Sequence, residues 1–333
     1  MPLWQPRLFV LLILAVLITS SCAWSQLVPG SVDVHWNEGA SNCARGSLPA
    51  LQVHAYNSRT FILRESLCAT FEAPFMYLLI GSEKAVLVDT GDIADSTQMP
   101  LAKTVMQLLP GEASAKLPLL VVHTHRHLDH RAGDAQFTHV PNVEVVGFDI
   151  GSVRRFYNFS DWPNGLAKIA LGDRIVDVIP TPGHNETEVS FYDRNTGLVF
   201  TGDFLLPGRL LIENASADLA SAKRMTAFIQ DRPVSYVLGG HIEMDRNGNL
   251  FSWQSQYHPN ERPLQMTKDE VLGLPAAIEG FNGFYSIRGH FIMMNSIHIL
   301  VASAVLIGIV LVAFVLMLVR YFRKRGRVAM NIS

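Results

Sequence analysis

The sequence predicts an α+β domain of about 250 residues that is joined to a transmembrane helix near the C-terminus. Three observations lead to this fold class. Short apolar runs alternate with helical patterns between residues 26 and 290, histidine or aspartate follows several of these runs, and residues 299–319 contain no charge and no proline. The first two observations describe a globular domain with a polar site, and the third describes its anchor.

The charged residues indicate which class of partner the protein binds. The 333 residues include 27 basic and 29 acidic side chains, and the formal net charge is -2. No long basic run occurs outside the last 14 residues, so a nucleic-acid-binding surface is not indicated. We therefore expect a small-molecule substrate.

Residues 1–25 have the order of a secretory signal peptide. Arg7 precedes the apolar run 8–18, and a small polar stretch follows. Eleven apolar residues are too few to cross a bilayer, which needs about 20. The alternatives are an uncleaved N-terminal anchor and a lipoprotein acceptor at Cys22, for which Thr19 is unfavourable.

The apolar segment 299–319 is predicted to be a transmembrane helix, since its length corresponds to about 32 Å of α-helix. Five basic residues lie just beyond it: Arg320, Arg323, Lys324, Arg325 and Arg327. The positive-inside rule then places the tail, residues 320–333, in the cytoplasm and the domain, residues 26–290, outside it. A buried core helix is the alternative.

Two cysteines remain after removal of the signal peptide. In an oxidising compartment, a disulfide between Cys43 and Cys68 would add roughly 3 kcal/mol of stability. Two thiols can also be buried singly. The sequence leaves their pairing open.

Apolar runs and turn residues place the elements of the domain in order. Residues 75–80 and 85–91 predict a hairpin around GSEK, and residues 95–111 predict a helix that ends at Pro-Gly. Further strands are expected at 117–125, 143–147, 173–183, 189–193, 198–203 and 234–241. A second helix is expected at 217–231.

Polar side chains follow several of these strands directly, namely Asp89, His125, His184, Asp203 and His241. Strand ends that meet at one edge of a sheet bring residues from distant parts of the chain together. We therefore expect these five side chains to share one cleft.

The segment HTHRHLDH, residues 123–130, carries the strongest chemical signal. His125 and His127 are two residues apart on an extended segment, so both rings point to one side and can share a metal ion. Asp129 and His130 follow at a turn and face a neighbouring position. His184, Asp203 and His241 would complete two adjacent metal positions.

The types of the candidate ligand residues limit which metals can bind. Imidazole and carboxylate ligands without thiolate suit zinc, manganese or iron. His123 is expected to support the ligands or to pack in the core. The remaining histidines are expected to be ordinary packed or surface residues: His35, His54, His139, His258, His290 and His298.

These residues resemble a known family. THRHLDHRAG resembles the HxHxDH motif of the metallo-β-lactamase superfamily, and VLVDTG, TPGH, FTGD and GGH resemble its other motifs in order. The resemblance implies a four-layer αβ/βα sandwich with two zinc ions, for which iron or manganese are alternatives. It assigns ligands as follows: His125, His127 and His184 to the first ion, Asp129, His130 and His241 to the second, and Asp203 to both. Asp89 would orient the ligand loop.

The resemblance also implies an activity. Family members with aspartate at the position of Asp203 include glyoxalase II-like hydrolases, lactonases and phosphodiesterases, whereas antibiotic-hydrolysing members usually have cysteine or serine there. We expect a metal-dependent hydrolase of an ester, thioester or lactone, in which a hydroxide shared by two ions attacks and Asp129 or Asp203 accepts the proton. Residues 242–290 do not resemble the basic glutathione-binding domain of glyoxalase II.

Other activities remain open at this stage. A persulfide dioxygenase would use a single iron in the first position, and phosphodiesterase or β-lactamase activity occurs in the same superfamily. A non-catalytic binding domain would usually have lost ligands. Asn185 stands where the family often has serine or threonine.

Two loops are candidates for the substrate pocket: residues 156–165 and 204–211. The first contains the aromatic side chains Phe156, Tyr157, Phe159 and Trp162. They could cover an apolar acyl or ring group. They could equally pack the domain.

Overall fold

The structure is a computed structural model that describes residues 26–45, 48–112 and 116–330. The predicted signal peptide, residues 1–25, lies outside the described residues. The same is true of the last three residues of the predicted tail and of the side chains of residues 322–330.

The first of two large sheets contains six strands in the order of the sequence. Its strands are β1 (Leu51–Asn57), β2 (Thr60–Glu65), β3 (Phe75–Ile80), β4 (Ala85–Val88), β5 (Leu119–Val122) and β6 (Val143–Val145). The pairs from β1 to β4 are antiparallel, and β4, β5 and β6 are parallel. The carboxyl ends of β4 and β5 therefore lie at the same edge.

The second sheet also has six strands, in the order β13-β12-β10-β9-β8-β7. Its strands are β7 (Ala167–Ala170), β8 (Ile175–Pro180), β9 (Val189–Asp193), β10 (Leu198–Gly202), β12 (Tyr236–Gly239) and β13 (Gln265–Met266). β10 and β12 are parallel, so Asp203 and His241 follow strands that end at one edge.

Side chains point alternately to the two faces of each central strand, so the buried apolar residues form three clusters. One cluster lies between the two large sheets, and one lies on the outer face of each sheet. Tyr77 and Val122 from the first sheet pack with Phe191 and Phe200 from the second, so the two sheets face one another. The opposite face of the first sheet packs on α1 (Leu101–Leu108). The outer face of the second sheet packs on α3 (Ala215–Ile229) and α4 (Lys268–Glu279).

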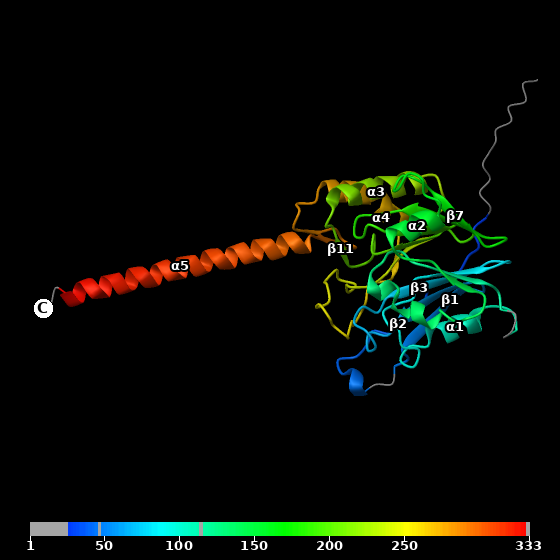
Figure 1. The fold of residues 1–333 in the computed structure, drawn as a ribbon, viewed down its shortest axis with the longest axis horizontal. Coiled ribbons are helices and arrows are strands. Elements are labelled where there is room, and N and C mark those ends of the chain that lie inside the picture. Colours follow the sequence, from blue (N-terminus) through cyan, green and yellow to red (C-terminus); the bar gives the residue numbers. More distant parts are fainter. Residues whose placement is uncertain (1–25, 46–47, 113–115, 331–333) are drawn as a thin grey trace, which may run out of the picture.

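The layers therefore run helix, sheet, sheet, helix, which Figure 1 shows with α1 on one side and α3 and α4 on the other. This arrangement matches the predicted αβ/βα sandwich. All predicted strands between residues 75 and 241 are present. The helix predicted at 95–111 is shorter, because it begins at Leu101 after Pro100.

A third sheet connects the domain to the C-terminal helix. Its three strands are β11 (Arg209–Leu211), β15 (Ile292–Met294) and β14 (Tyr285–Ile287), with β15 in the centre. A single residue, Asn295, separates β15 from α5 (Ser296–Met330). β15 thus lies beyond residue 290, where the sequence placed the end of the domain.

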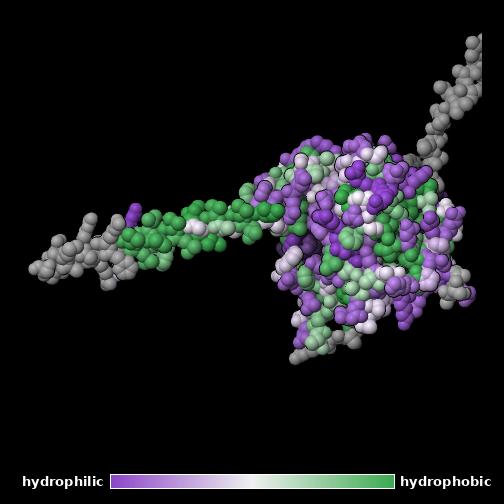
Figure 2. Space-filling view, in the orientation of Figure 1, coloured by the Kyte–Doolittle hydropathy of each residue, from purple (hydrophilic) through white to green (hydrophobic). Residues whose placement is uncertain are grey.

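α5 projects from the domain and is apolar along most of its length (Figures 1 and 2). The most apolar 18-residue window within residues 296–321 has a mean hydropathy of 3.2, and none of this window is buried. The alternative of a buried core helix is therefore wrong. By its length and composition alone, this helix could cross a bilayer.

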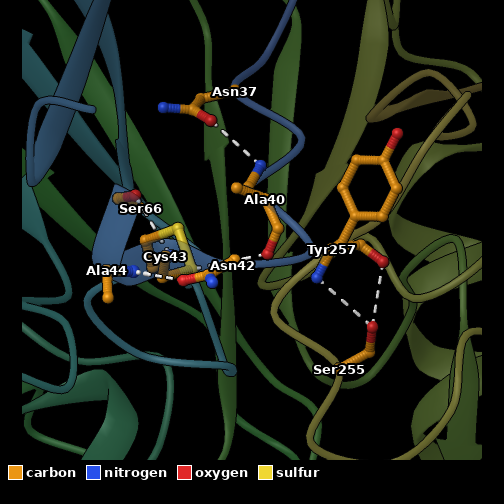
Figure 3. The surroundings of a disulfide bond; sticks show 10 residues. Asn37, Ala40, Asn42, Cys43, Ala44, Ser66, Ser255 and Tyr257 are labelled. Carbon is orange, nitrogen blue, oxygen red and sulfur yellow. Dashed lines mark hydrogen bonds between the residues drawn. A yellow bond between two sulfur atoms is a disulfide. The ribbon is translucent and has the colours of Figure 1, made fainter. Parts of the chain in front are cut away.

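Cys43 and Cys68 form a disulfide, which settles the pairing that the sequence left open. Cys43 belongs to a short 3-10 helix (Cys43–Arg45), and Cys68 lies in the turn after β2. Figure 3 shows the bond beside Ser66, whose hydroxyl accepts a hydrogen bond from the backbone N–H of Cys68. The disulfide ties the N-terminal segment to the first sheet.

Candidate metal centre

The candidate metal centre lies where strands of the two large sheets end. Asp89 directly follows β4, His125 and His127 follow β5, and His184 lies in the loop between β8 and β9. Asp203 and His241 follow β10 and β12. The structure brings these side chains together: the histidines and Asp203 belong to two neighbouring groups, and Asp89 contacts His130 of one of them.

The three-histidine group consists of His125, His127 and His184. Nδ1 of His127 lies 2.9 Å from Nε2 of His125 and 3.0 Å from Nε2 of His184. Three imidazole nitrogens thus converge on one point. Neutral imidazole nitrogens in this arrangement can bind one cation together.

The four-residue group consists of Asp129, His130, Asp203 and His241. Nε2 of His241 lies 3.3 Å from both Oδ2 of Asp129 and Nε2 of His130. His130 is fully buried in the 3-10 turn Leu128–His130, while Asp129 and Asp203 are partly exposed. This group offers two carboxylates in addition to two imidazoles.

Asp203 reaches both groups. Its Oδ2 lies 3.6 Å from Nε2 of His184, and its Oδ1 lies 3.4 Å from Nε2 of His130. Oδ1 is buried and has no hydrogen-bond partner. A buried carboxylate oxygen without a partner is costly, so a cation at this point would satisfy it.

Two backbone features leave room for this carboxylate. A Cβ atom at Gly240 would lie 2.5 Å from Oδ1 of Asp203 and 2.9 Å from Cε1 of His130. Gly202 has a φ of +52°, a conformation that favours glycine, and a Cβ there would lie 2.6 Å from Cβ of Thr124. The glycines of FTGD and GGH therefore permit the close approach of the ligand loops.

Asp89 fixes the orientation of the segment that follows β5. Its carboxylate accepts hydrogen bonds from the backbone N–H and the hydroxyl of Thr124, at 2.7 and 2.8 Å. Oδ2 of Asp89 also lies 2.9 Å from Nδ1 of His130. This contact leaves Nε2 of His130 facing Asp129 and Asp203, which is how a carboxylate orients a histidine ligand.

The electrostatics of the two groups differ. Burial lowers the pKa of His184 to about 4 and also lowers the pKa of His125 and His127. The rings of the three-histidine group are therefore neutral at pH 7. Neutral imidazole is the form that binds metals.

In the four-residue group, the carboxylates reverse the effect of burial. Burial favours neutral rings, but Asp203 and Asp129 outweigh it, raising the pKa of His241 to about 10 and that of His130 well above its usual value. Burial would raise the pKa of both aspartates, but His130 and His241 instead lower the pKa of Asp129 to about 2 and hold that of Asp203 well below its usual range. A divalent cation would take the place of the two imidazole protons.

The donor set therefore fits one or two divalent cations. It contains imidazole and carboxylate groups and no thiolate, which is the chemistry expected for zinc, manganese or iron. The orphaned Oδ1 of Asp203 supports the same conclusion.

The other histidines lie apart from these groups. His123 is buried with Nε2 2.9 Å from Oδ1 of Asp134, so it packs beside the ligand segment. In the described part of the chain, neither group includes any of the six histidines expected to be ordinary residues. Asn185 contacts a ligand candidate directly, because its amide lies 3.0 Å from Nε2 of His127.

A cavity of about 180 Å³ opens beside the two groups. Three of its lining residues were not singled out by the sequence, namely Glu72, Glu243 and Trp253, whereas Arg209 belongs to the expected loop 204–211. Arg209 is not a free cation, because its Nη1 donates to Oε1 of Glu243 at 3.1 Å. Burial raises the pKa of Glu72 to about 7, despite the opposing effect of His241.

The two candidate pocket loops have different positions. Leu206, Arg209 and Leu211 of loop 204–211 line the cavity. In the aromatic loop, Tyr157 and Phe159 instead pack in the core between the sheets, where Trp162 joins them. These aromatic side chains therefore pack the domain, and none of the four lines the cavity beside the metal groups.

Fold and site together define the class of protein. The Metallo-beta-lactamase superfamily pattern matches residues 69–253, more than half of the chain, and the chain belongs to this superfamily. The chain combines the fold of this superfamily with histidine-rich candidate metal sites.

The curated relatives are thioester hydrolases. Acyl-coenzyme A thioesterase MBLAC2 of Homo sapiens is 26% identical over 247 residues, which cover 63% of this chain and 88% of that protein. Hydroxyacylglutathione hydrolase of Bartonella tribocorum is 30% identical over 156 residues, 46% of this chain and 59% of that protein. A solved metallo-β-lactamase from Hirschia baltica is 15% identical and covers 69% of this chain and 98% of its own, with a TM-score of 0.47.

Proposed function

We propose that the protein is a metal-dependent hydrolase of acyl thioesters, with esters and lactones as related substrates. The observation that carries this proposal is the position of Asp203 between the two ligand groups. A carboxylate that contacts both groups suits a pair of cations. A redox enzyme with a single iron in the first position is the alternative, and analysis of the metal in protein purified without added metal separates the two.

The relatives support the thioester as the substrate class. Both types of relative described above are thioester hydrolases by name. Arg209 in the cavity lining is paired with Glu243, so its guanidinium group is not available to bind a phosphodiester. This favours an acyl group over a phosphodiester.

The proposed ligands are His125, His127 and His184 for one cation and Asp129, His130 and His241 for the other, with Asp203 shared. Two divalent cations, zinc in our proposal, would supply an activated water at neutral pH and polarise the carbonyl group. Asp129 faces the cavity and is the proposed acceptor of the released proton, with Asp203 as the second candidate. Asp89 would hold His130 in the orientation required.

The test compares substrates with defined metal content. Full-length protein is stripped with a chelator, loaded with zinc or with iron, and supplied with an acyl thioester, a lactone, a phosphodiester and a chromogenic β-lactam. We expect the zinc-loaded protein to hydrolyse the thioester fastest. A phosphodiester that is cleaved about tenfold faster would refute the substrate class, and one iron with oxygen uptake would refute the hydrolase.

We also infer that α5 anchors the protein in a membrane, with the metal centre outside the cytoplasm. The disulfide supports an oxidising compartment. The basic residues after position 319 support a cytoplasmic tail. Protease added to intact cells or spheroplasts should digest the domain and leave a tag after Ser333 protected. Protection of the domain with an accessible tag would reverse this orientation.

A further inference from the structure

One wall of the metal-centre cavity is continuous with the start of α5. Leu211 of β11 lines the cavity and pairs with Met294 of β15. Ser296, the first residue of α5, follows two positions later. At about 3.3 Å per residue, the cavity wall lies within roughly 10 Å of the helix along the strand.

Hydrogen bonds fix the direction in which α5 leaves the domain. The buried side chain of Asn295 donates to the backbone carbonyl of Ile212 at 2.9 Å and accepts from the backbone N–H of His298 at 2.9 Å. Its backbone N–H donates to Phe284. Nδ1 of His298 lies 2.8 Å from the carbonyl oxygen of Gly283. The first turn of α5 is thus tied to the ends of both β11 and β14, with no linker between domain and helix.

Exposed apolar side chains lie around this junction. We call Trp253, Phe284, Tyr285 and Ile287 the apolar rim. Ile287 is 67% exposed and Trp253 is 65% exposed, while Phe284 and Tyr285 are also exposed. β14 is an edge strand of the third sheet, and Trp253 lines the same cavity as Leu211 of that sheet. Aromatic side chains beside a transmembrane helix are typical of the lipid headgroup region.

We infer that the apolar rim rests in the headgroup region of the membrane that α5 enters, so that the metal centre takes long-chain acyl thioesters or esters from the bilayer. The substrate part rests on the proposed hydrolase function. The headgroup region is only about 5 to 7 Å thick on each side of the hydrocarbon core. A single residue separates β15 from α5, and Tyr285 pairs with Met294, the last residue of β15, so the rim begins at the end of the third sheet from which α5 leaves.

The cavity suits this substrate class. Trp253 belongs to the rim and also lines the cavity, where its ring packs 5.9 Å from that of Phe71 between centroids. Leu206 and Leu211 add apolar surface. An acyl chain could therefore pass from the bilayer along Trp253 to the metal groups without crossing water. The driving force is the burial of the CH₂ groups, which stay out of water along this path.

Fluorescence in lipid vesicles tests the docking of the rim directly. Full-length protein with Ile287→Cys is labelled with an environment-sensitive fluorophore and placed in phosphatidylcholine vesicles, with unsubstituted protein as the background. Leu166→Cys is the matched control, because Leu166 is 56% exposed and precedes β7, at the end of the domain opposite α5 in Figure 1. We expect blue-shifted emission, quenched by brominated lipids, at position 287 only.

Either of two results would overturn the docking. Emission at position 287 that matches position 166 would place the rim in water. A blue shift without quenching by brominated lipid would mean that protein, such as a second copy of the chain, covers the rim. Both readouts are independent of enzymatic activity.

Kinetics test the substrate part. Ile287→Glu should lower hydrolysis of a palmitoyl thioester held in vesicles by about fivefold or more, while hydrolysis of soluble acetyl thioester stays within about twofold. Leu166→Glu should change neither rate. An equal effect of Ile287→Glu on both substrates contradicts the bilayer route. If the zinc-loaded wild type cleaves no thioester at all, the proposed hydrolase fails, and the fluorescence still decides the docking.

Discussion

The two ligand groups lie side by side, yet they hold protons in opposite ways. In the three-histidine group burial lowers the pKa of each ring, and in the four-residue group the carboxylates raise the pKa of both rings. His125 of the first group is as buried as His130 and His241 of the second, so burial alone does not distinguish the two groups. The difference shows that neighbouring charge decides whether a buried imidazole is neutral.

This contrast has a consequence for metal binding. The three-histidine group is ready to bind a cation at neutral pH, whereas the four-residue group must first release protons. The two carboxylates of the second group offset this cost, because they attract a divalent cation more strongly than three neutral imidazoles do. Asp203 links the two groups, so we expect their occupancies to depend on one another.

The largest effect is expected for Asp203→Ala, because this change removes a ligand candidate from both groups. We expect the protein to lose most of its bound metal and its hydrolytic rate to fall on the order of 10³-fold. Metal content by mass spectrometry and a thioester assay measure the two effects. His139→Ala is the control, since His139 is exposed and should affect neither. Unchanged stoichiometry in the Asp203 variant would refute its assignment.

Single substitutions should separate the two groups. His127→Ala should remove the cation of the three-histidine group, and His241→Ala that of the four-residue group. We expect each variant to keep about one equivalent of zinc after reconstitution and to lose most activity. Each purified variant is dialysed against limiting zinc and its metal content is measured. Loss of one equivalent in one variant and none in the other would show that the structure contains a single metal position.

Proton release should follow the same division. Zinc binding to the His241→Ala variant should release almost no protons at pH 7, because the pKa of His184 is about 4. Binding to the His127→Ala variant should release about one or two, because the raised pKa of His130 and His241 keeps these rings protonated. Lowering the pH from 8 to 6 should therefore weaken only the latter binding. Calorimetry in buffers of different ionisation enthalpy counts these protons, and the opposite order would contradict the electrostatic account.

The smallest expected effect concerns a buried carboxylate that has no imidazole beside it. Burial raises the pKa of Glu65 to about 8, and Asp92 contributes to this increase. Because the folded-state pKa exceeds the unfolded one, the folded protein holds the proton, and its stability should fall as the pH rises from 5 to 8. The slope is at most about 1.4 kcal/mol for each pH unit.

Glu65→Gln should flatten this dependence, since the amide does not titrate. Urea unfolding at several pH values measures it. Glu144→Gln, at an exposed position, is the control and should leave the dependence unchanged. An equally steep loss in the Glu65 variant would assign the dependence to other groups.

The central fold could be predicted because its strands are short apolar runs between turn residues. Elements defined by tertiary contacts were missed. α4 contains Pro275 within its span, which argues against a helix in sequence, and β11, β14 and β15 have only three residues each. Such short strands form through pairing between distant segments, and no local pattern predicts it.

The candidate ligands could be predicted because their spacing and their positions after apolar strands are properties of the sequence. Only part of the cavity wall could be predicted, because Leu206, Arg209 and Leu211 belong to the expected loop 204–211. Glu72 and Trp253 come from other segments, and nothing in their local sequence distinguishes them. For the aromatic loop the sequence left a pocket role and a packing role open, and Tyr157 and Phe159 pack in the core.

Titration of zinc into stripped full-length protein, with release of free thiol from an acyl thioester as the readout, tests the central claim most directly. We expect no hydrolysis without metal, a rise that reaches its plateau near two equivalents of zinc, and no recovery in the Asp203→Ala variant. Equal hydrolysis by the stripped protein, or a plateau at one equivalent that the Asp203→Ala variant also reaches, would contradict the account.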